Sequence, residues 1–258
     1  MAKAFGMTEA PRVSVVIPCY NHGAFIAEAI ASVRAQTFAD LEIVVVNDGS
    51  DDPQTNWVLD ALEGERLTVL RTPNRGTAAA RNAAITHAQG EFILPLDADD
   101  RIAPRYLELA VAVMDRDPQV RVVSGRVELF GERSGEWRLP DYSPARLLVD
   151  NMLVATSLFR RSDWQRVGGY REDLCGWEDW DFWLAVLAGG GTVERLDEVV
   201  FYYRIRHDSR DRALRLGSKL SLTLKMIGCH RKLYLANWRP IFGLLLRGAT
   251  HGRVDLSV

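Results

Sequence analysis

Apolar and polar positions divide the first hundred residues into short apolar runs separated by amphipathic segments. The runs at 13–17, 41–46, 67–70 and 92–96 are rich in β-branched and other large apolar residues, which predicts four buried strands. Nearly continuous apolar runs of this kind are typical of parallel strands that are covered on both faces. We therefore expect these strands to form the centre of a parallel sheet.

The segments between these runs have helical patterns. Apolar residues recur at helical spacing from Phe25 to Val33, which predicts a helix to about Gln36. Asp51 or Asp52 followed by Pro53 is a typical helix start, and the alanine-rich stretch 77–88 favours a third helix. The alternation of strand and helix indicates an α/β fold with right-handed crossovers.

The second half has a more varied pattern and no clear linker. It predicts one catalytic domain that continues into a helical C-terminal extension from about Arg212. The expected elements are a helix at 104–115, a strand at 120–130 with a break left open at Gly125, a short helix at 142–149, a strand at 153–159, a helix from 177 to 187 and one or two strands at 193–204.

Two strands of the first half end in acidic loops. The run 92–96 is followed by Asp97, Asp99 and Asp100, and the run 41–46 leads through Asn47 into Asp48. Ligands of open α/β sheets bind beyond the carboxyl ends of the strands, and clustered carboxylates are costly without a nearby positive charge. A divalent cation that holds a phosphate would supply this charge. The alternative is an acidic turn that caps the next helix, but two such loops at one sheet edge favour a ligand site.

Five motifs in register resemble those of the family 2 glycosyltransferases. They are Val-Ser-Val-Val-Ile-Pro-Cys-Tyr-Asn, Val-Asn-Asp-Gly-Ser-Asp-Asp, Asn-Arg-Gly-Thr-Ala-Ala-Ala-Arg-Asn, Leu-Asp-Ala-Asp-Asp and Trp-Glu-Asp-Trp-Asp. The resemblance covers about residues 12–206. It implies the GT-A fold, a Rossmann-like and mostly parallel sheet flanked by helices.

The resemblance also implies roles for individual residues. Asp48 matches the acid that binds the nucleotide base, Asp97 the DxD acid near the ribose, and Asp99 the acid that coordinates Mn²⁺ or Mg²⁺ on the diphosphate. Asp179, in the pair Glu178–Asp179, matches the catalytic base of inverting members. Six further residues are expected to border the nucleotide: Pro18, Tyr20, Glu28, Asn74, Gly76 and Arg81.

One motif departs from the family pattern. Family members often carry Tyr-Arg-x-His near the end of the catalytic domain, whereas this chain has Tyr203, Arg204, Ile205, Arg206 and then His207. Arg206 therefore stands at the usual histidine position. It could neutralise diphosphate charge, and a metal-ligand role for His207 is in doubt.

The implied activity is transfer of a sugar from a nucleotide sugar, expected to be a UDP-sugar, to a saccharide or polyprenyl-linked acceptor in surface polysaccharide synthesis. The leaving diphosphate must be neutralised, which metal on Asp99 would do, and the acceptor hydroxyl must lose a proton, which Asp179 could accept. For Glu178 and Asp179 the alternative is stabilisation of a helix dipole. For Trp177, Trp180 and Trp183, spaced by three, core packing is favoured over sugar stacking.

Two other functions are compatible with these features. A sugar nucleotidyltransferase is expected to have a glycine-rich basic loop after its first strand, but residues 18–23 contain no Lys or Arg. A non-catalytic nucleotide-sugar-binding module would not need both Asp99 and Asp179, which this chain retains.

Charge is distributed unevenly along the 258 residues, although the net charge is only −2. From Arg204 onward there are 12 Lys/Arg and 3 Asp/Glu, against 20 and 31 in the remainder. A basic tail fits an anionic partner, namely nucleic acid, a membrane surface or a lipid phosphate. Taken with the resemblance, we expect an anionic membrane and no nucleic acid. The expected parts are an N-terminal extension (1–11), a nucleotide-binding half (12–100), an acceptor-binding half (101–206) and a basic helical extension (207–258).

The cysteines and the apolar segments indicate the cellular compartment. Three widely spaced cysteines without a CxxC pair argue against a zinc site or a disulfide framework, and fit a reducing compartment. Cys19 has no histidine partner evident in the sequence, so we expect a buried thiol. Residues 1–11 lack the apolar core of a signal peptide, and no apolar run approaches the ~20 residues that span a bilayer. We expect a cytoplasmic protein, peripheral at the inner membrane face.

Overall fold

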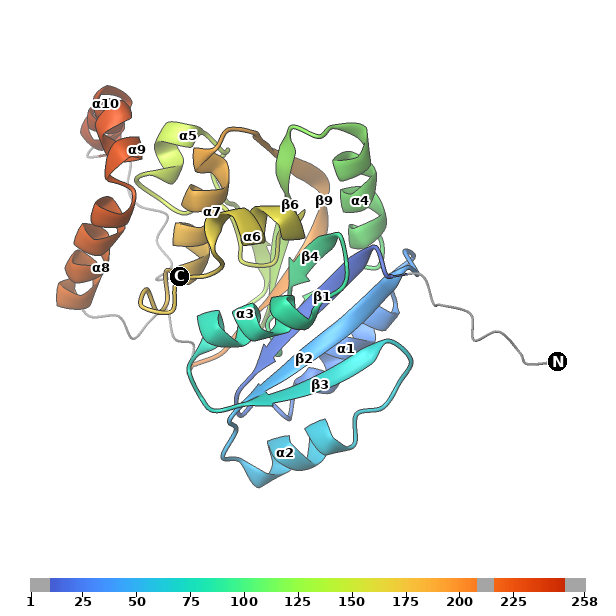
Figure 1. Ribbon diagram of the computed structural model, residues 1–258. Helices are drawn as coiled ribbons and strands as arrows, with labels where there is room; N and C mark the ends of the chain where they lie inside the picture. The colour runs from blue at the N-terminus through green and yellow to red at the C-terminus, as the bar shows by residue number, and fades with distance from the viewer. Residues whose placement is uncertain (1–9, 208–215, 249–258) are drawn as a thin grey trace.

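A computed structural model describes residues 10–207 and 216–248 of the chain. Within these ranges the strands form one nine-stranded mixed sheet in the order β3-β2-β1-β4-β8-β6-β9-β5, with β7 paired to β6. Helices lie on both sides of the sheet, and the last three helices stand in a column at one side of the molecule (Figure 1).

The first half confirms the predicted alternation of strands and helices. Strands β1 to β4 pair in parallel in the order β3-β2-β1-β4. The elements are β1 (Val13–Cys19), α1 (Ile26–Arg34), β2 (Leu41–Asp48), α2 (Pro53–Asp60), β3 (Leu67–Thr72), α3 (Thr77–His87) and β4 (Phe92–Pro95).

The alternating side chains of β1 and β2 enter two different cores, as the pleat of a strand requires. Val15 and Ile43 pack with α1 and with α4 (Tyr106–Arg116) on one face. Val16 and Val44 pack with α3 and with α7 (Glu178–Ala188) on the other. Burial on both faces explains why these strands have continuous apolar sequences rather than alternating ones.

The start of α2 follows from the local sequence. Asp52 caps α2 by accepting hydrogen bonds from the backbone N–H groups of Gln54 and Thr55, with Pro53 in the first turn.

Strand β1 continues through Pro18, one residue beyond the apolar run 13–17 from which the strand was predicted. Pro18 lies beyond Val16, the last residue that pairs with β4, so its missing N–H does not interrupt that ladder.

The second half adds antiparallel strands, and it differs from the prediction in several places. The predicted strand over 153–159 is shorter, since β8 begins at Leu158, and strands β5 and β7 and helix α6 were not predicted. The break left open at Gly125 does not occur, although the pairing of β6 with β9 shifts register there. The elements are β5 (Arg101–Ile102), β6 (Val120–Gly131), β7 (Gly135–Trp137), α5 (Pro144–Leu147), β8 (Leu158–Arg160), α6 (Arg161–Val167) and β9 (Thr192–Ile205).

The C-terminal extension is helical where the structure describes it. It contains α8 (Leu216–Cys229), α9 (Arg231–Ala236) and α10 (Trp238–Gly248), which lie beside α5 and α7 (Figure 1). Residues 208–215, with Arg212 and Arg215, and residues 249–258 lie outside the described part, as do residues 1–9 of the predicted N-terminal extension.

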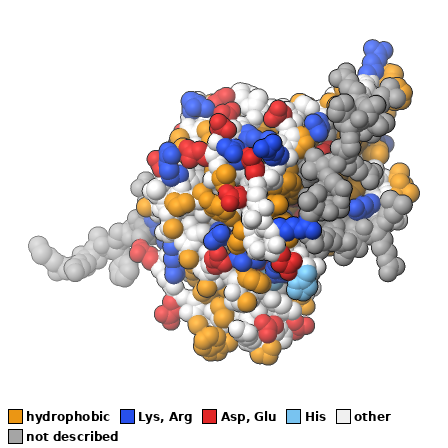
Figure 2. Space-filling view, turned by 180° about the vertical axis from the view of Figure 1, so that it is seen from behind, with side chains coloured by type: hydrophobic (Ala, Val, Ile, Leu, Met, Phe, Trp, Pro, Cys, Tyr) orange, Lys and Arg blue, Asp and Glu red, His pale blue; other side chains and the backbone are white. Residues whose placement is uncertain are grey.

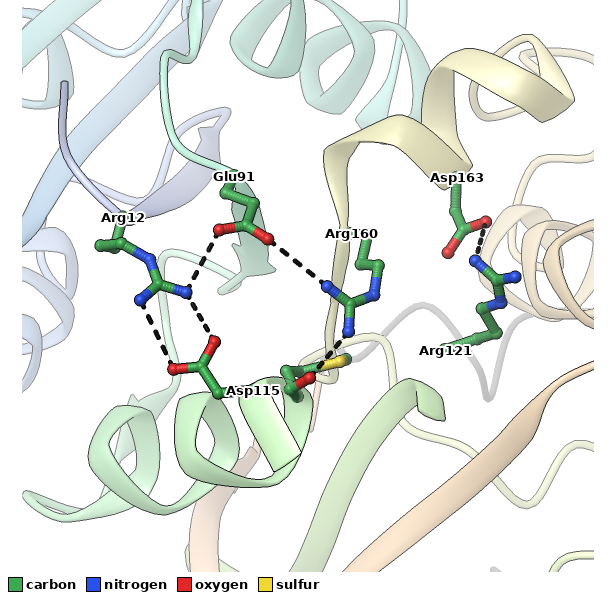
Figure 3. A network of polar contacts seen from close by, with 7 residues as sticks. Arg12, Glu91, Asp115, Arg121, Arg160 and Asp163 are labelled. Carbon is green, nitrogen blue, oxygen red and sulfur yellow. Dashed lines mark hydrogen bonds and ion pairs between the residues drawn. The ribbon is translucent and has the colours of Figure 1, made fainter. Parts of the chain in front are cut away.

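A polar network joins the two halves at the amino ends of β1 and β4. The Arg12 guanidinium lies 2.7 Å from Asp115 at the end of α4 and 3.2 Å from Glu91, and Glu91 also pairs with Arg160 (Figure 3). These pairs are largely exposed, so each contributes little to stability. They lie at the end of the sheet opposite the carboxyl ends of β1 and β4 (Figure 3).

Three buried polar groups connect β1, β2 and the turn before β4. The Ser14 hydroxyl donates to the Glu42 carboxylate at 2.6 Å and accepts from the backbone N–H of Gly90 at 2.8 Å. A Cβ atom placed on Gly90 would lie 2.6 Å from the Ser14 backbone nitrogen and 2.8 Å from the Val13 carbonyl carbon. The turn therefore approaches β1 more closely than any side chain permits.

We expect Gly90→Ala to lower the free energy of unfolding by about 1–3 kcal/mol, because rigid backbone must move to admit the methyl group. Urea denaturation would measure the loss. Gly243→Ala is the matched control, since a Cβ atom there meets nothing within 4 Å and φ is not positive. Alanine inside α10 should leave stability unchanged or raise it slightly. Equal midpoints for Gly90→Ala and the wild type would contradict the argument.

Candidate functional site

The carboxyl ends of β2 and β4 lie on either side of β1 at one edge of the sheet. Asp48 ends β2, and Asp97, Asp99 and Asp100 follow β4. The fold therefore brings together the two acidic loops that the sequence placed at one edge. Each carboxylate has its own hydrogen-bond and ion-pair partners there, and these partners indicate what each acid can do.

Asp48 is buried and holds the loop that leads into α3. Its carboxylate accepts hydrogen bonds from the backbone N–H groups of Arg75 at 3.0 Å and Gly76 at 2.8 Å. Gly76 has φ of 90°, a conformation that favours glycine. Asn74 in the same loop is exposed, and its backbone packs closely against Gly49. Contact of Asp48 with a nucleotide base stays a prediction; the bonds observed here position the loop.

Arg81 joins two motifs that lie far apart in the sequence. Its guanidinium lies 2.7 Å from Asp97 and 3.8 Å from Glu178, and its side chain is only 3% exposed. Burial opposes the guanidinium charge, but Asp97, the Tyr170 ring below it and Glu178 outweigh burial and raise the pKa of Arg81. The predicted border residue is thus the buried cation between the DxD loop and the start of α7.

Asp99 faces two basic side chains rather than solvent. Arg206, at the end of β9, lies 3.2 Å from one carboxylate oxygen, and the His22 ring lies 3.9 Å from the other. Burial and the neighbouring Asp97 raise the pKa of Asp99, while His22 and Arg206 act in the opposite direction. Burial and the charge of Asp97 therefore outweigh the two basic partners.

Asp100 is the most deeply buried acid of the cluster and contacts backbone. It accepts the backbone N–H of Arg204 at 2.8 Å, and burial with the charges of Asp99 and Asp97 raises its pKa well above the ordinary range. The Arg204 side chain donates to the Asp99 carbonyl at 2.6 Å and pairs with Glu28, which also pairs with Arg101 at 2.9 Å. Glu28 thus holds two arginines against the DxD loop.

One histidine lies at the DxD loop and another lies away from it. The His22 side chain is 25% exposed and lies beside Asp99 and Arg206. The sequence carries a signal for this position, since His22 follows β1 at the same sheet edge as the acids. The His207 ring is instead 86% exposed and pairs with Glu132 at 3.1 Å, away from Asp99.

The acids at the start of α7 have separate environments. Glu178 is buried and accepts the backbone N–H of Gly176 at 2.6 Å in addition to facing Arg81. Asp179 is partly exposed, accepts its neighbour's backbone N–H at 2.8 Å and accepts from the Asn151 side chain at 3.2 Å. Asn151, which no sequence pattern identified, orients this carboxylate. Asp179 is thus the more accessible acid of the pair.

The remaining predicted border residues lie next to the first strand. Pro18 and Tyr20 are half-buried at the carboxyl end of β1. Cys19 between them is fully buried, and burial raises the pKa of its thiol to about 11, so it is protonated at neutral pH. This confirms the prediction of a buried thiol and excludes a role for Cys19 as a thiolate nucleophile at neutral pH.

The three tryptophans of α7 divide between core and surface. Trp183 is fully buried with Phe159 and Phe182, as expected for core packing. Trp177 and Trp180 are partly buried, with their ring planes tilted by 54° and their centroids 5.0 Å apart, and the Trp180 indole donates to the Leu147 carbonyl. The stripe therefore packs mainly against the protein.

The acids of the DxD loop fit a hard divalent cation brought by a phosphate ligand. In the described residues no three His, Cys, Asp or Glu side chains are arranged as a cage for a metal ion. Mg²⁺ is usually held by one or two carboxylates together with substrate phosphates, so a cage is not needed. Asp99 offers carboxylate oxygens beside Asp97 and Asp100, and oxygen is the ligand type that hard divalent cations prefer.

Comparison of the sequence with protein families gives two matches. The model described as Glycosyl transferase family 2 matches residues 14–171, and the model described as N-terminal domain of galactosyltransferase matches residues 146–208. Among curated proteins, Hyaluronan synthase of Pasteurella multocida is 30% identical over 213 residues. The matched residues cover 80% of this chain but 22% of that protein, so the chain spans about a fifth of this relative's length.

Solved structures share the fold. The S. aureus TarS fragment 1-349 in complex with UDP-GlcNAc matches with a TM-score of 0.74 and 21% identity, covering 95% of this chain and 74% of that one. Mannosyltransferase PcManGT from Pyrobaculum calidifontis, in complex with GDP-Man and Mn²⁺, matches with a TM-score of 0.63 and 22% identity, covering 96% and 77%. The predicted GT-A arrangement is confirmed.

We expect Arg81→Met to lower the free energy of unfolding by about 3–5 kcal/mol, because it leaves the buried Glu178 carboxylate and the partly exposed Asp97 carboxylate without their shared cation. Arg75→Met is the matched control: Arg75 pairs with Glu172 at 2.6 Å, but its side chain is 64% exposed. That substitution should cost at most about 1 kcal/mol. Urea denaturation of both variants tests the difference, and similar losses would show that burial of the Arg81 pair has no special weight.

Proposed function

The chain belongs to glycosyltransferase family 2, and from this premise we propose that it transfers a sugar from a nucleoside diphosphate sugar to a hydroxyl group of an acceptor. The observation that carries the proposal is the joining of the DxD loop to the Glu178–Asp179 pair through Arg81. This ion-pair chain holds a diphosphate-binding loop and a candidate base at one site.

The donor side comprises residues 12–100 in this proposal. Tyr20, Asp48 and the loop that Asp48 holds would receive the nucleoside, with Asp97 nearer the ribose. Asp99 would hold Mn²⁺ or Mg²⁺, with Asp97 beside it, and the ion would neutralise charge on the leaving diphosphate when bound. Arg206 and His22 stand at Asp99 already, and Arg206 can turn toward the phosphates as a further positive group.

We propose UDP as the carrier nucleotide of the donor. Support comes from the similarity in fold to a protein crystallised with UDP-GlcNAc. A structure crystallised with GDP-Man has the same fold, so the nucleotide has to be measured rather than inferred from the fold.

The acceptor side comprises residues 101–206 and includes the start of α7. Asp179 is the proposed base, because it is partly exposed while Glu178 is committed to Arg81 and a backbone N–H. The carboxylate would take the proton of the attacking hydroxyl as the new glycosidic bond forms on the face opposite the leaving diphosphate, which inverts the anomeric carbon. Glu178 is then a positioning residue.

We propose a saccharide or a polyprenyl-linked saccharide as the acceptor, in the synthesis of a surface polysaccharide. The similarity to a protein named Hyaluronan synthase supports a polysaccharide product. A polyprenyl-linked acceptor would also require contact between this chain and a membrane surface.

The nucleotide of the donor can be identified by thermal shift. UDP, GDP, dTDP and CDP should be compared by thermal shift, each with and without Mn²⁺ or Mg²⁺. We expect one nucleotide, UDP in our proposal, to raise the melting temperature only with metal, since a ligand at 100 times its Kd stabilises by about 2.7 kcal/mol. Asp99→Ala should abolish this shift.

Asp60→Ala is the control for this panel, because Asp60 is an exposed acid on α2 that pairs only with Arg71 among the described contacts. It should retain the full shift. Absence of any nucleotide shift in the wild type, with either metal, would remove the main support for a glycosyltransferase.

The second prediction concerns the base. Asp179→Asn should reduce the release of nucleoside diphosphate from the matching nucleotide sugar by about 10²–10⁴-fold, the usual contribution of a positioned general base. The metal-dependent thermal shift of the same variant should be unchanged, because Asp179 is not expected to contact the nucleotide. Full turnover by Asp179→Asn would exclude it as the base. A wild type that binds nucleotide but releases no product would indicate a binding module.

A further inference from the structure

Within the described residues, the helices of the C-terminal extension contact the rest of the protein along one side. Met226 of α8 is buried, and Leu233, Tyr234 and Ile241 are partly buried against the core that contains Phe182 and Trp183. This inner side resembles an ordinary amphipathic helix face packed on a core. It fixes which side of α8, α9 and α10 faces outward.

Two polar contacts anchor the same inner side. The His230 ring nitrogen lies 2.7 Å from the Asp181 carboxylate of α7, with 10% and 3% of the two side chains exposed. Lys225 lies 2.8 Å from the Asp173 carboxylate and donates to the Asp173 carbonyl at 2.8 Å. The extension is thus attached to the helix that begins with Glu178 and Asp179.

The outward side is also apolar, which a solvated helix face would not be. Seven large apolar side chains are exposed among the described residues, and six of them lie on this extension. Leu220, Leu224 and Ile227 follow one another at helical spacing on α8. The complete set is Leu220, Leu224, Ile227, Leu235, Trp238 and Phe242, which we term the apolar ridge.

Scattered exposed hydrophobic residues need no explanation, but a concentrated patch marks an interaction surface. The seventh exposed residue, Trp57, lies on α2, at the far side of the molecule from α8–α10 (Figure 1). The apolar ridge is therefore a local feature of the extension.

The charge of the extension selects the kind of partner. Residues 216–248 contain six Lys/Arg and no Asp or Glu. Lys219, Arg231, Lys232 and Arg239 are exposed around the apolar ridge, and Figure 2 shows apolar and basic side chains together at this edge of the molecule. A second copy of the chain would present the same cationic surface, so two such faces would repel each other.

A membrane surface with anionic headgroups matches both properties. Basic residues are attracted to the headgroups, and leucine, phenylalanine and tryptophan side chains enter the boundary with the acyl chains. Among the described helices none is long and apolar enough to cross a bilayer, so the helices would lie along the surface.

We propose that the apolar ridge and its surrounding basic residues dock this chain on an anionic lipid surface. The docking surface is argued from the extension alone and does not depend on the proposed sugar transfer. One consequence does rest on the proposed function: the His230–Asp181 contact would hold the start of α7 near the membrane, where a polyprenyl-linked acceptor resides.

Co-sedimentation of the full chain with lipid vesicles tests the proposal. We expect binding to vesicles of phosphatidylcholine with phosphatidylglycerol, loss of binding as salt rises, and little binding to phosphatidylcholine alone. Trp238→Gln should weaken binding by roughly tenfold, because one large apolar side chain no longer enters the lipid. Trp57→Gln is the matched control and should bind as the wild type does.

Three results would overturn the proposal. They are no binding to anionic vesicles, equal loss in Trp57→Gln and Trp238→Gln, and concentration-dependent self-association without lipid that Trp238→Gln abolishes. The last would identify a second copy as the partner. Because the nucleotide thermal shift is measured without vesicles, failure of docking and failure of the proposed sugar transfer are separately visible.

Discussion

The buried guanidinium of Arg81 is the interaction on which the site depends. It lies between Asp97, which follows β4, and Glu178, which begins α7, although 81 residues separate these acids in the sequence. A buried cation with two carboxylate partners is stable only when all three groups are held in place. The loop after β4 and the start of α7 therefore keep their positions only when β4, α3 and α7 are packed together.

The second constraint is the balance of charge at the DxD loop. Three acids occupy four positions there, and the structure surrounds them with Arg81, Arg204 and Arg206. Two of these arginines come from the end of β9, so the last strand of the domain completes a loop formed early in the chain. Even so, burial and the charges of the neighbouring acids raise the pKa values of Asp99 and Asp100. A site of this kind favours a ligand that arrives with a cation.

Much of the fold was predictable because it is encoded locally. The continuous apolar sequences of β1, β2 and β4, the Asp52–Pro53 start of α2 and the alanine-rich α3 were all identified from the chain alone. Strand β8 was placed too early because an apolar run such as 153–159 has no periodicity that separates strand from buried loop. Helix α6 was missed because its polar sequence, from Arg161 to Val167, has no apolar stripe.

The sequence by itself determined the α/β class, the family resemblance and the acids at the ends of β2 and β4, because these depend on short-range patterns and motif spacing. Tertiary structure alone decided the partners of those acids. It committed Asp48 and Glu178 to backbone N–H groups, brought His22 to Asp99, turned His207 toward Glu132 and left the apolar ridge exposed among the described residues. Such pairings depend on contacts between distant segments, and their burial and distances exist only once the chain has folded.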